Sequence, residues 1–74
     1  MAEYITKNQL LELEEAQLFG IQQFHKLLKE YTGIVAKSYT AYSYYDNDGN
    51  YIGDGENSSL QDLLNEAYVE VRDD

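Results

Sequence analysis

The segment SYTAYSYYDNDGNYIGDGE, residues 38–56, decides how the rest of the chain is arranged. Its first half is rich in tyrosine and small residues, a composition that suits a pleated, half-buried strand. Asp48-Gly49 follows, and this dipeptide is typical of tight hairpin turns because those turns need positive φ angles. Tyr51-Ile52 then resumes the strand pattern before a run of glycines and acids. We predict a β-hairpin over residues 34–54 with an acidic turn.

The two faces of this hairpin follow from its predicted register. Residues 34–45 read as one strand, and a two-residue turn at Asp48-Gly49 pairs Tyr45 with Ile52 and Asp46 with Tyr51. Side chains alternate along a strand. The predicted core face therefore carries Val35, Tyr39, Ala41, Tyr45 and Ile52. The predicted outer face carries Ser38, Thr40, Tyr42, Tyr44, Asp46 and Tyr51. A shift of one residue would exchange the two faces.

A helix is predicted before the hairpin, over residues 7–31. Thr6 and Gln9 have the spacing of a capping box. Apolar residues then recur along one side of the helix, and they are Leu10, Leu13, Leu18, Ile21, Phe24, Leu28 and Tyr31. Gly33 suits the left-handed conformation that ends many helices.

Phe19 and Gly20 interrupt this helical pattern. Gly20 either permits close packing or divides the helix in two. Phe19 falls on the polar side, where it is either a partner-binding residue, as exposed aromatics often are, or is covered by a kink at Gly20 or by a second subunit.

A second helix is predicted after the hairpin, over residues 60–72. Ser59 and Asp62 again have capping-box spacing. The apolar residues that follow at helical spacing are Leu60, Leu63, Leu64, Ala67, Tyr68 and Val71. The predicted fold is a single α+β domain, a helix–β-hairpin–helix (αββα) with the helices packed on one face of a small antiparallel sheet.

The net charge of −9 is concentrated in the second half of the 74-residue chain. Residues 1–45 hold five acids and four bases, giving −1, whereas residues 46–74 hold nine acids and one base, giving −8. Such an acidic half repels nucleic acid and anionic membranes and attracts basic protein surfaces. The alternative is that the charge only keeps the protein soluble.

The composition disfavours most catalytic and metal-binding functions. The chain has no cysteine and a single histidine, His25, whereas a catalytic triad needs three converging groups. The acids and amides of residues 46–56 fail the EF-hand pattern in both registers, which leaves weak calcium binding as an alternative. We predict no enzymatic activity, no metal and no cofactor.

The sequence also suggests a compartment. The N-terminal residues do not show the pattern of a signal peptide, and the apolar runs are too short to span a membrane. Because cysteine is absent as well, we predict a cytoplasmic protein.

The candidate binding residues combine acids with tyrosines. Asp62, Glu66 and Glu70 recur every four residues, so on a helix they would lie about 6 Å apart, a spacing similar to that of phosphates along a DNA strand. Tyrosine gives a large contact area with a polar tip, and it is enriched at interfaces. The predicted partner-binding residues are Tyr42, Tyr44, Asp46, Asp48, Tyr51, Asp54, Glu56, Asp62, Glu66 and Glu70.

In length, charge and the tyrosine-plus-acid composition of its hairpin and helix, the chain resembles small acidic proteins that bacteriophages and mobile elements use against host systems. These include DNA-mimic inhibitors of restriction enzymes, of uracil-DNA glycosylase and of CRISPR effectors. The resemblance implies an inhibitor in the host cytoplasm that occupies the basic site of a nucleic-acid-binding protein and contacts neither nucleic acid nor membrane directly. The alternative is a small homodimeric assembly or regulatory module whose acids only confer solubility.

Overall fold

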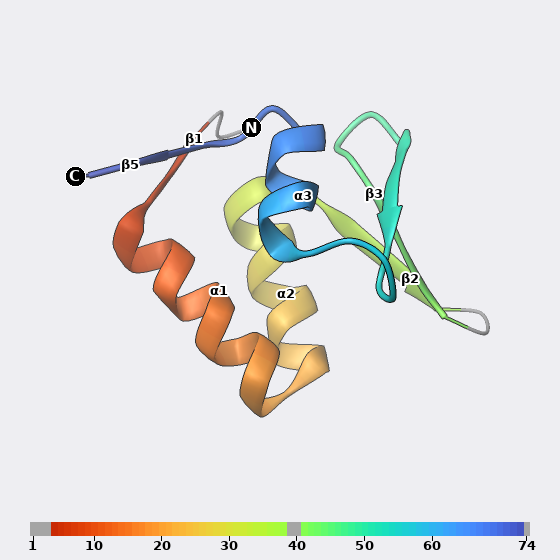
Figure 1. Cartoon of the computed structure of the whole chain (residues 1–74), viewed down its shortest axis with the longest axis horizontal. Helices are drawn as coiled ribbons and strands as arrows, with labels where there is room; N and C mark the ends of the chain where they lie inside the picture. The colour runs from red at the N-terminus through yellow and green to blue at the C-terminus, as the bar shows by residue number, and fades with distance from the viewer. Residues whose placement is uncertain (1–3, 39–40, 74) are drawn as a thin grey trace.

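The computed structural model describes residues 4–38 and 41–73, which form an α+β fold with two separate sheets (Figure 1). In chain order the elements are β1 (Tyr4–Thr6), α1 (Lys7–Phe19), α2 (Ile21–Thr32), β2 (Val35–Ser38), β3 (Tyr42–Tyr45), β4 (Tyr51–Asp54), α3 (Leu60–Glu66) and β5 (Glu70–Arg72). The α+β class agrees with the prediction. The arrangement is richer than helix–hairpin–helix, because each long predicted element is divided.

The predicted helix over residues 7–31 is two helices, α1 and α2, joined at Gly20. Gly20 is extended, with φ −175°, and it is both the C-cap of α1 and the N-cap of α2. Its N–H donates to the carbonyl of Ala16 at 2.8 Å, and its carbonyl accepts from Phe24 at 3.0 Å. The prediction of one helix was wrong, and the alternative that Gly20 divides it is confirmed. The break lets Leu13 of α1 and Phe24 of α2 both reach the same core, where neither is exposed.

Both predicted N-terminal capping boxes are confirmed. At α1 the N–H of Gln9 donates to the Thr6 hydroxyl at 3.1 Å, and the N–H of Thr6 donates to the Gln9 side chain at 2.9 Å. At α3 the N–H of Asp62 donates to the Ser59 hydroxyl at 3.2 Å, and the N–H of Ser59 donates to the Asp62 carboxylate at 3.0 Å. Each pair satisfies backbone donors that a helix start leaves free.

The predicted long strand over residues 34–45 is also wrong, because it is two antiparallel strands, β2 and β3. A 12-residue strand would be about 40 Å long, whereas the longest dimension of the molecule is 37 Å. The chain instead folds back, so that Ala36 pairs with Tyr44 and β3 becomes the central strand of the order β2-β3-β4. Tyr39 and Thr40, which the prediction placed on opposite faces, lie outside the described residues.

The hairpin between β3 and β4 is present, but its turn is longer than predicted. Ser43 pairs with Asp54 and Tyr44 with Gly53, and the register then shifts by one residue, so that Tyr45 pairs with Tyr51 instead of Ile52. The Asp46 carboxylate accepts the N–H groups of Asp48 and Asn50 at 2.9 and 2.8 Å. These bonds stabilise a loop over residues 46–50 in place of the two-residue turn, with Gly49 at φ 87°.

The fold-back exchanges the predicted faces of β3, whereas Ile52 of β4 packs against the core as predicted. Tyr44 was expected on the outer face, yet it is 3% exposed and belongs to the core. Tyr42 also packs against the core. Tyr45, expected inside, lies on the outer face, where Lys37 stands 4.9 Å above its ring. Because side chains alternate along a strand, the register of β2 and β3 reverses every assignment on β3 at once.

The helices α2 and α3 cover the inner face of this sheet. His25 of α2 contacts the rings of Tyr42 and Tyr44. Leu63 of α3 lies against Gly53, where an added Cβ would come within 3.2 Å of it. Tyr44 and Gly53 are register partners and so share one face. Figure 1 shows the three-stranded sheet on one side of these helices and the β1–β5 pair on the other.

The predicted helix over residues 60–72 is wrong in its second half. α3 ends at Glu66, and Tyr68 takes the left-handed conformation with φ 59°. The N–H of Tyr68 donates to the carbonyl of Asn65 at 3.1 Å, and that of Val69 donates to Leu64 at 2.9 Å. This is the bond pattern of a Schellman motif, and it turns the chain out of the helix.

The chain continues as β5, which pairs in parallel with β1. Ile5 lies beside Val71 in this pair. Ile5 is fully buried, and buried backbone groups need hydrogen-bond partners. Strand pairing with β5 supplies these partners, which a helix over residues 67–72 would not.

The core lies where the three helices meet the two sheets. Its fully buried side chains are Phe24, Ile5, Leu13, Leu28, Ile34, Leu63 and Leu64. Thr32 is the buried polar residue among them; its hydroxyl donates to the Leu28 carbonyl at 2.6 Å and accepts from Ile34 at 3.2 Å. Leu18, predicted on the apolar side of the first helix, is instead 82% exposed.

Candidate functional site

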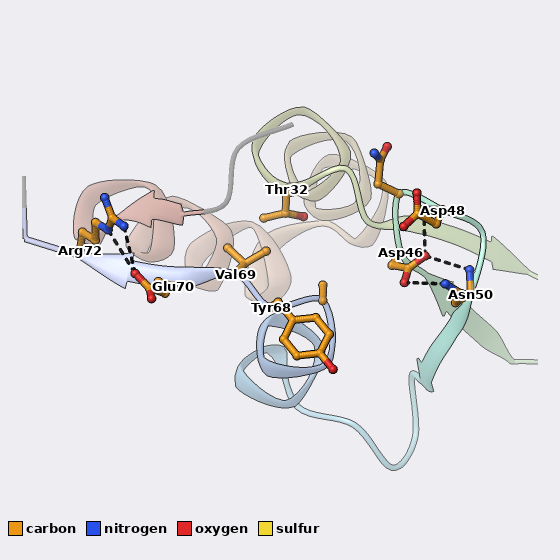
Figure 2. A pocket seen from close by; sticks show the side chains of 10 residues that line it. Thr32, Asp46, Asp48, Asn50, Tyr68, Val69, Glu70 and Arg72 are labelled. Carbon is orange, nitrogen blue, oxygen red and sulfur yellow. Dashed lines mark hydrogen bonds and ion pairs between the residues drawn. The ribbon is translucent and has the colours of Figure 1, made fainter.

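A groove of about 540 Å³ lies between the β3–β4 loop and the corner where α3 leads into β5 (Figure 2). Asp46, Asn47, Asp48 and Asn50 line it from the loop. Ala67, Tyr68, Val69, Glu70 and Arg72 line it from the corner, and Thr32 lies between the two walls. Segments about twenty residues apart in the sequence therefore form one surface.

The loop wall of the groove is held in shape by Asp46. Its carboxylate accepts two backbone N–H groups and the side-chain amide of Asn50, the last at 3.2 Å. These bonds, led by the backbone N–H of Asn50, hold the pKa of Asp46 below its ordinary value because they favour the charged form. Asp48 beside it is exposed. The loop wall thus presents the Asp46 carboxylate, which the loop's own hydrogen bonds hold in place, and the exposed Asp48 beside it.

The opposite wall presents an exposed ring and an ion pair. Tyr68 is 89% exposed, and Figure 2 shows its ring between the loop and β5. Arg72 donates to the Glu70 carboxylate from Nε and Nη2, both at 3.2 Å. The Arg72 guanidinium also stands 4.2 Å above the ring of Tyr4. Since Arg72 is the cation that lines the groove, and it is already paired, the groove as a whole is acidic.

The structure brings together three of the predicted acids and separates the others. Asp46, Asp48 and Glu70 line the groove. Asp54 and Glu56 lie at the end of β4 and in the loop that follows it, and Asp62 and Glu66 lie on α3.

The predicted array of acids along one helix does not exist. Asp62 and Glu66 are on α3, but Glu70 is on β5. Asp62 also belongs to the cap of α3. The physical reason is the left-handed turn at Tyr68, which ends the helical spacing before Glu70.

Asp54 has the same structural role as Asp46. Its carboxylate accepts the backbone N–H groups of Glu56 and Asn57 at 3.1 and 2.7 Å, together with the Asn57 side-chain amide. These bonds, chiefly that of the Asn57 backbone, hold the pKa of Asp54 below its ordinary value. Both aspartates therefore act as turn formers, a role typical of aspartate in loops.

The predicted tyrosine anchors divide into one exposed residue and two that pack inside. Tyr51 is 57% exposed, and its ring contacts that of Tyr45 at 5.8 Å. Tyr44 was wrongly assigned to a binding surface: its hydroxyl lies 2.8 Å from His25 Nε2, and burial raises its pKa. Tyr42 stacks edge-on against His25 at 4.6 Å between ring centroids.

His25 is the centre of this buried aromatic cluster. Burial lowers its pKa, because a low-dielectric environment disfavours the imidazolium form. Its ring packs against Tyr42 and Tyr44 and bonds to the Tyr44 hydroxyl beneath the sheet.

Sequence reasoning missed Tyr68, Asn47, Asn50 and Arg72 as residues of the groove. Tyr68 falls at an apolar position of the predicted helix, so the sequence gives no signal that it turns outward. The two asparagines are residue types common in turns, so the sequence gives no signal that they line a groove. Arg72 is the one base of residues 46–74, which is the signal that could have singled it out.

The part of the chain that the structure describes was searched for clusters of metal-ligating side chains and for membrane-spanning helices, and neither is found. Across residues 4–38 and 41–73, no three His, Asp or Glu side chains are grouped so as to hold a metal ion. The helices among these residues also lack the combined length and apolarity needed to cross a membrane.

Comparison of the chain with protein-family models, curated protein sequences and solved structures finds no match. The groove and the charges around it are therefore the features from which a function can be inferred.

Proposed function

We propose that this protein is a non-enzymatic acidic binding protein that blocks the basic site of a nucleic-acid-binding enzyme or effector. The observation that carries the proposal is the groove, which Asp46, Asp48 and Glu70 line together with the exposed Tyr68. Lysine and arginine side chains pair with carboxylates and stack on aromatic faces. A basic nucleic-acid-binding surface offers both kinds of contact.

The charge distribution supports the same partner class. Residues 46–74 carry −8, and the acids of this half that do not line the groove are at the end of β4, on the β4–α3 loop, on α3 and after β5. Such a field accelerates association with a cationic surface and is screened over about 10 Å at 0.1 M salt.

Competition with DNA tests the proposal directly. A labelled DNA duplex is bound to each of three enzymes, namely a restriction endonuclease, a uracil-DNA glycosylase and a CRISPR effector nuclease, and is then titrated with the protein. We expect displacement of DNA from at least one enzyme, weakening as salt rises. Failure with all three would contradict the proposal for these classes.

Two matched double variants locate the site. D48K/E70K reverses two groove acids, and E14K/E15K reverses two exposed acids of α1; each changes the net charge by +4, from −9 to −5. We expect D48K/E70K to weaken displacement by about tenfold or more, as loss of central contacts does, and E14K/E15K to leave it nearly unchanged. Equal loss in both variants would show that net charge alone acts and that the groove is not the site.

A further inference from the structure

The helix α1 is apolar on two opposite sides, unlike an ordinary surface helix. Leu13 and Ala16 are buried, and Leu10 packs against the core. Leu11 and Leu18 are on the other side of the same helix and are 55% and 82% exposed.

The exposed leucines form a ridge that ends at an exposed aromatic ring. Leu11 and Leu18 are seven residues apart, so they lie on one side of α1 about 10 Å from each other. Phe19 follows at 86% exposure, and Ile21, just across Gly20, is 39% exposed. Single exposed apolar residues are normal, whereas several gathered along one side of a helix indicate a docking surface.

Glutamates surround this ridge. Glu15 lies on it between the two leucines. Glu14 lies on the flank toward α3, where it shares a shallow groove with Leu60 and Gln61. Glu12 lies on the flank toward α2, where its carboxylate accepts a hydrogen bond from the Tyr31 hydroxyl. The sequence has no lysine or arginine between Lys7 and Lys26, and Lys7 is paired with Asp73 at 2.6 Å.

This charge pattern decides between two occupants. If α1 of a second copy packed against this α1, both helices would bring Glu12, Glu14 and Glu15 into one small interface. Like charges across an interface are costly. A helix with an apolar stripe flanked by lysine or arginine would cover the leucines and pair with the glutamates. Helices commonly bind in this way through side chains at i, i+3, i+4 and i+7.

We propose that the outer face of α1, made of Leu11, Glu14, Glu15, Leu18 and Phe19, binds a basic amphipathic helix of a partner protein. The interaction is independent of the groove, because these residues belong to the first half of the chain and none of them lines it.

The test uses synthetic peptides of about 18 residues, long enough to form a helix on binding. The probe has leucines on one helical stripe and lysines beside them. One control replaces the lysines with glutamates, and a second keeps the composition but scrambles the order, so that the leucines share no face. Binding is measured by fluorescence anisotropy, and helix formation by circular dichroism. We expect the probe to bind and both controls to bind at least about tenfold more weakly.

Variants of the protein then assign the surface. L11S/L18S removes the apolar ridge, and E14K/E15K reverses its charge while keeping the leucines, so each should weaken binding of the probe by about tenfold or more. D48K/E70K is the matched control and should bind the probe like the unaltered protein. Thermal unfolding verifies that each variant is folded.

Three results would overturn the inference. The first is equal binding of the probe to the unaltered protein and to both α1 variants. The second is equal binding of the scrambled peptide, which would show that charge alone is recognised. The third is a stable dimer in sedimentation that L11S/L18S abolishes and that the probe does not displace, because a second copy would then cover the ridge.

Discussion

The C-terminal ends of α2 and α3 have the same backbone conformation but use different residues. Each helix ends at a residue in the left-handed conformation, Gly33 at φ 78° after α2 and Tyr68 at φ 59° after α3. Glycine adopts this conformation readily, whereas a residue with a Cβ pays roughly 1–2 kcal/mol. Gly33 is buried, and Tyr68 is 89% exposed beside the groove.

We infer that the difference reflects stability at α2 and the proposed binding function at α3. At α2 the left-handed conformation is adopted by a glycine, Gly33, which takes it without strain. At α3 a strained tyrosine is retained, and proteins keep such strain chiefly at functional sites, where the surrounding structure maintains it. Here the Schellman hydrogen bonds and the buried pair of Leu64 and Val69 maintain it. Tyr68 is thus the residue whose replacement best tests the proposed site.

The largest loss of stability is expected at Gly53, and the effects at the two helix ends should be smaller. Its φ is 155°, and an added Cβ would lie 2.3 Å from the Ser58 hydroxyl. We expect Gly53→Ala to lower the free energy of unfolding by about 2–4 kcal/mol, since backbone strain and overpacking act together. Urea denaturation measures the change. Gly20→Ala is the control, because φ is ordinary there and an added Cβ would have no atom within 4 Å. Similar losses of unfolding free energy at both positions would contradict this explanation.

A smaller loss is expected at the end of α2. Gly33→Ala places a Cβ in the left-handed conformation, and the strain exceeds the gain from a stiffer unfolded chain by about 1 kcal/mol. The melting temperature should fall accordingly. A variant as stable as the unaltered protein would show that this helix end relaxes without strain, and the contrast with Tyr68 would disappear.

A gain is expected at the end of α3. Tyr68→Gly relieves the same strain, and after the entropy cost of glycine we expect an increase of about 0.5–1 kcal/mol in the free energy of unfolding. Tyr68→Ala keeps the strain and should give no such increase. In the DNA competition assay both variants should bind about tenfold more weakly, because the ring is absent from each. Full binding by Tyr68→Gly would remove Tyr68 from the proposed site.

The smallest expected effect is a change of stability with pH that comes from His25 on α2. Burial lowers the pKa of His25 on α2 below its ordinary value of 6.5, so the unfolded chain takes up a proton first as the pH falls. The contribution of His25 is therefore complete above 6.5 and is lost as the pH falls through the folded-state pKa. Denaturation at a series of pH values should show this step in the unaltered protein.

His25→Gln should remove that step while leaving the acid limb at lower pH. There the lowered pKa values of Asp46 and Asp54, ordinarily 3.8, make stability present above 3.8 and lost as the pH falls further. A step that survives in His25→Gln would have to come from another group.

Local signals in the sequence determined the parts of the fold that neighbouring residues control. The capping boxes at Thr6 and Ser59, the left-handed Gly33 and the hairpin at Asp48-Gly49 all involve residues within four positions of each other. The α+β class followed from the same patterns. The acidity of residues 46–74 is likewise a property of the sequence itself.

Tertiary structure alone decided where the predicted strand over residues 34–45 and the predicted helix over residues 60–72 break, and which side chains face outward. The chain folds back between β2 and β3, which moved Tyr44 from the predicted surface to the core. Pairing of β5 with β1 ended α3 early and separated Glu70 from Asp62 and Glu66. The physical reason is that strand pairing and burial join residues far apart in sequence, as Ile5 and Val71 are, and no local pattern contains the identity of a distant partner.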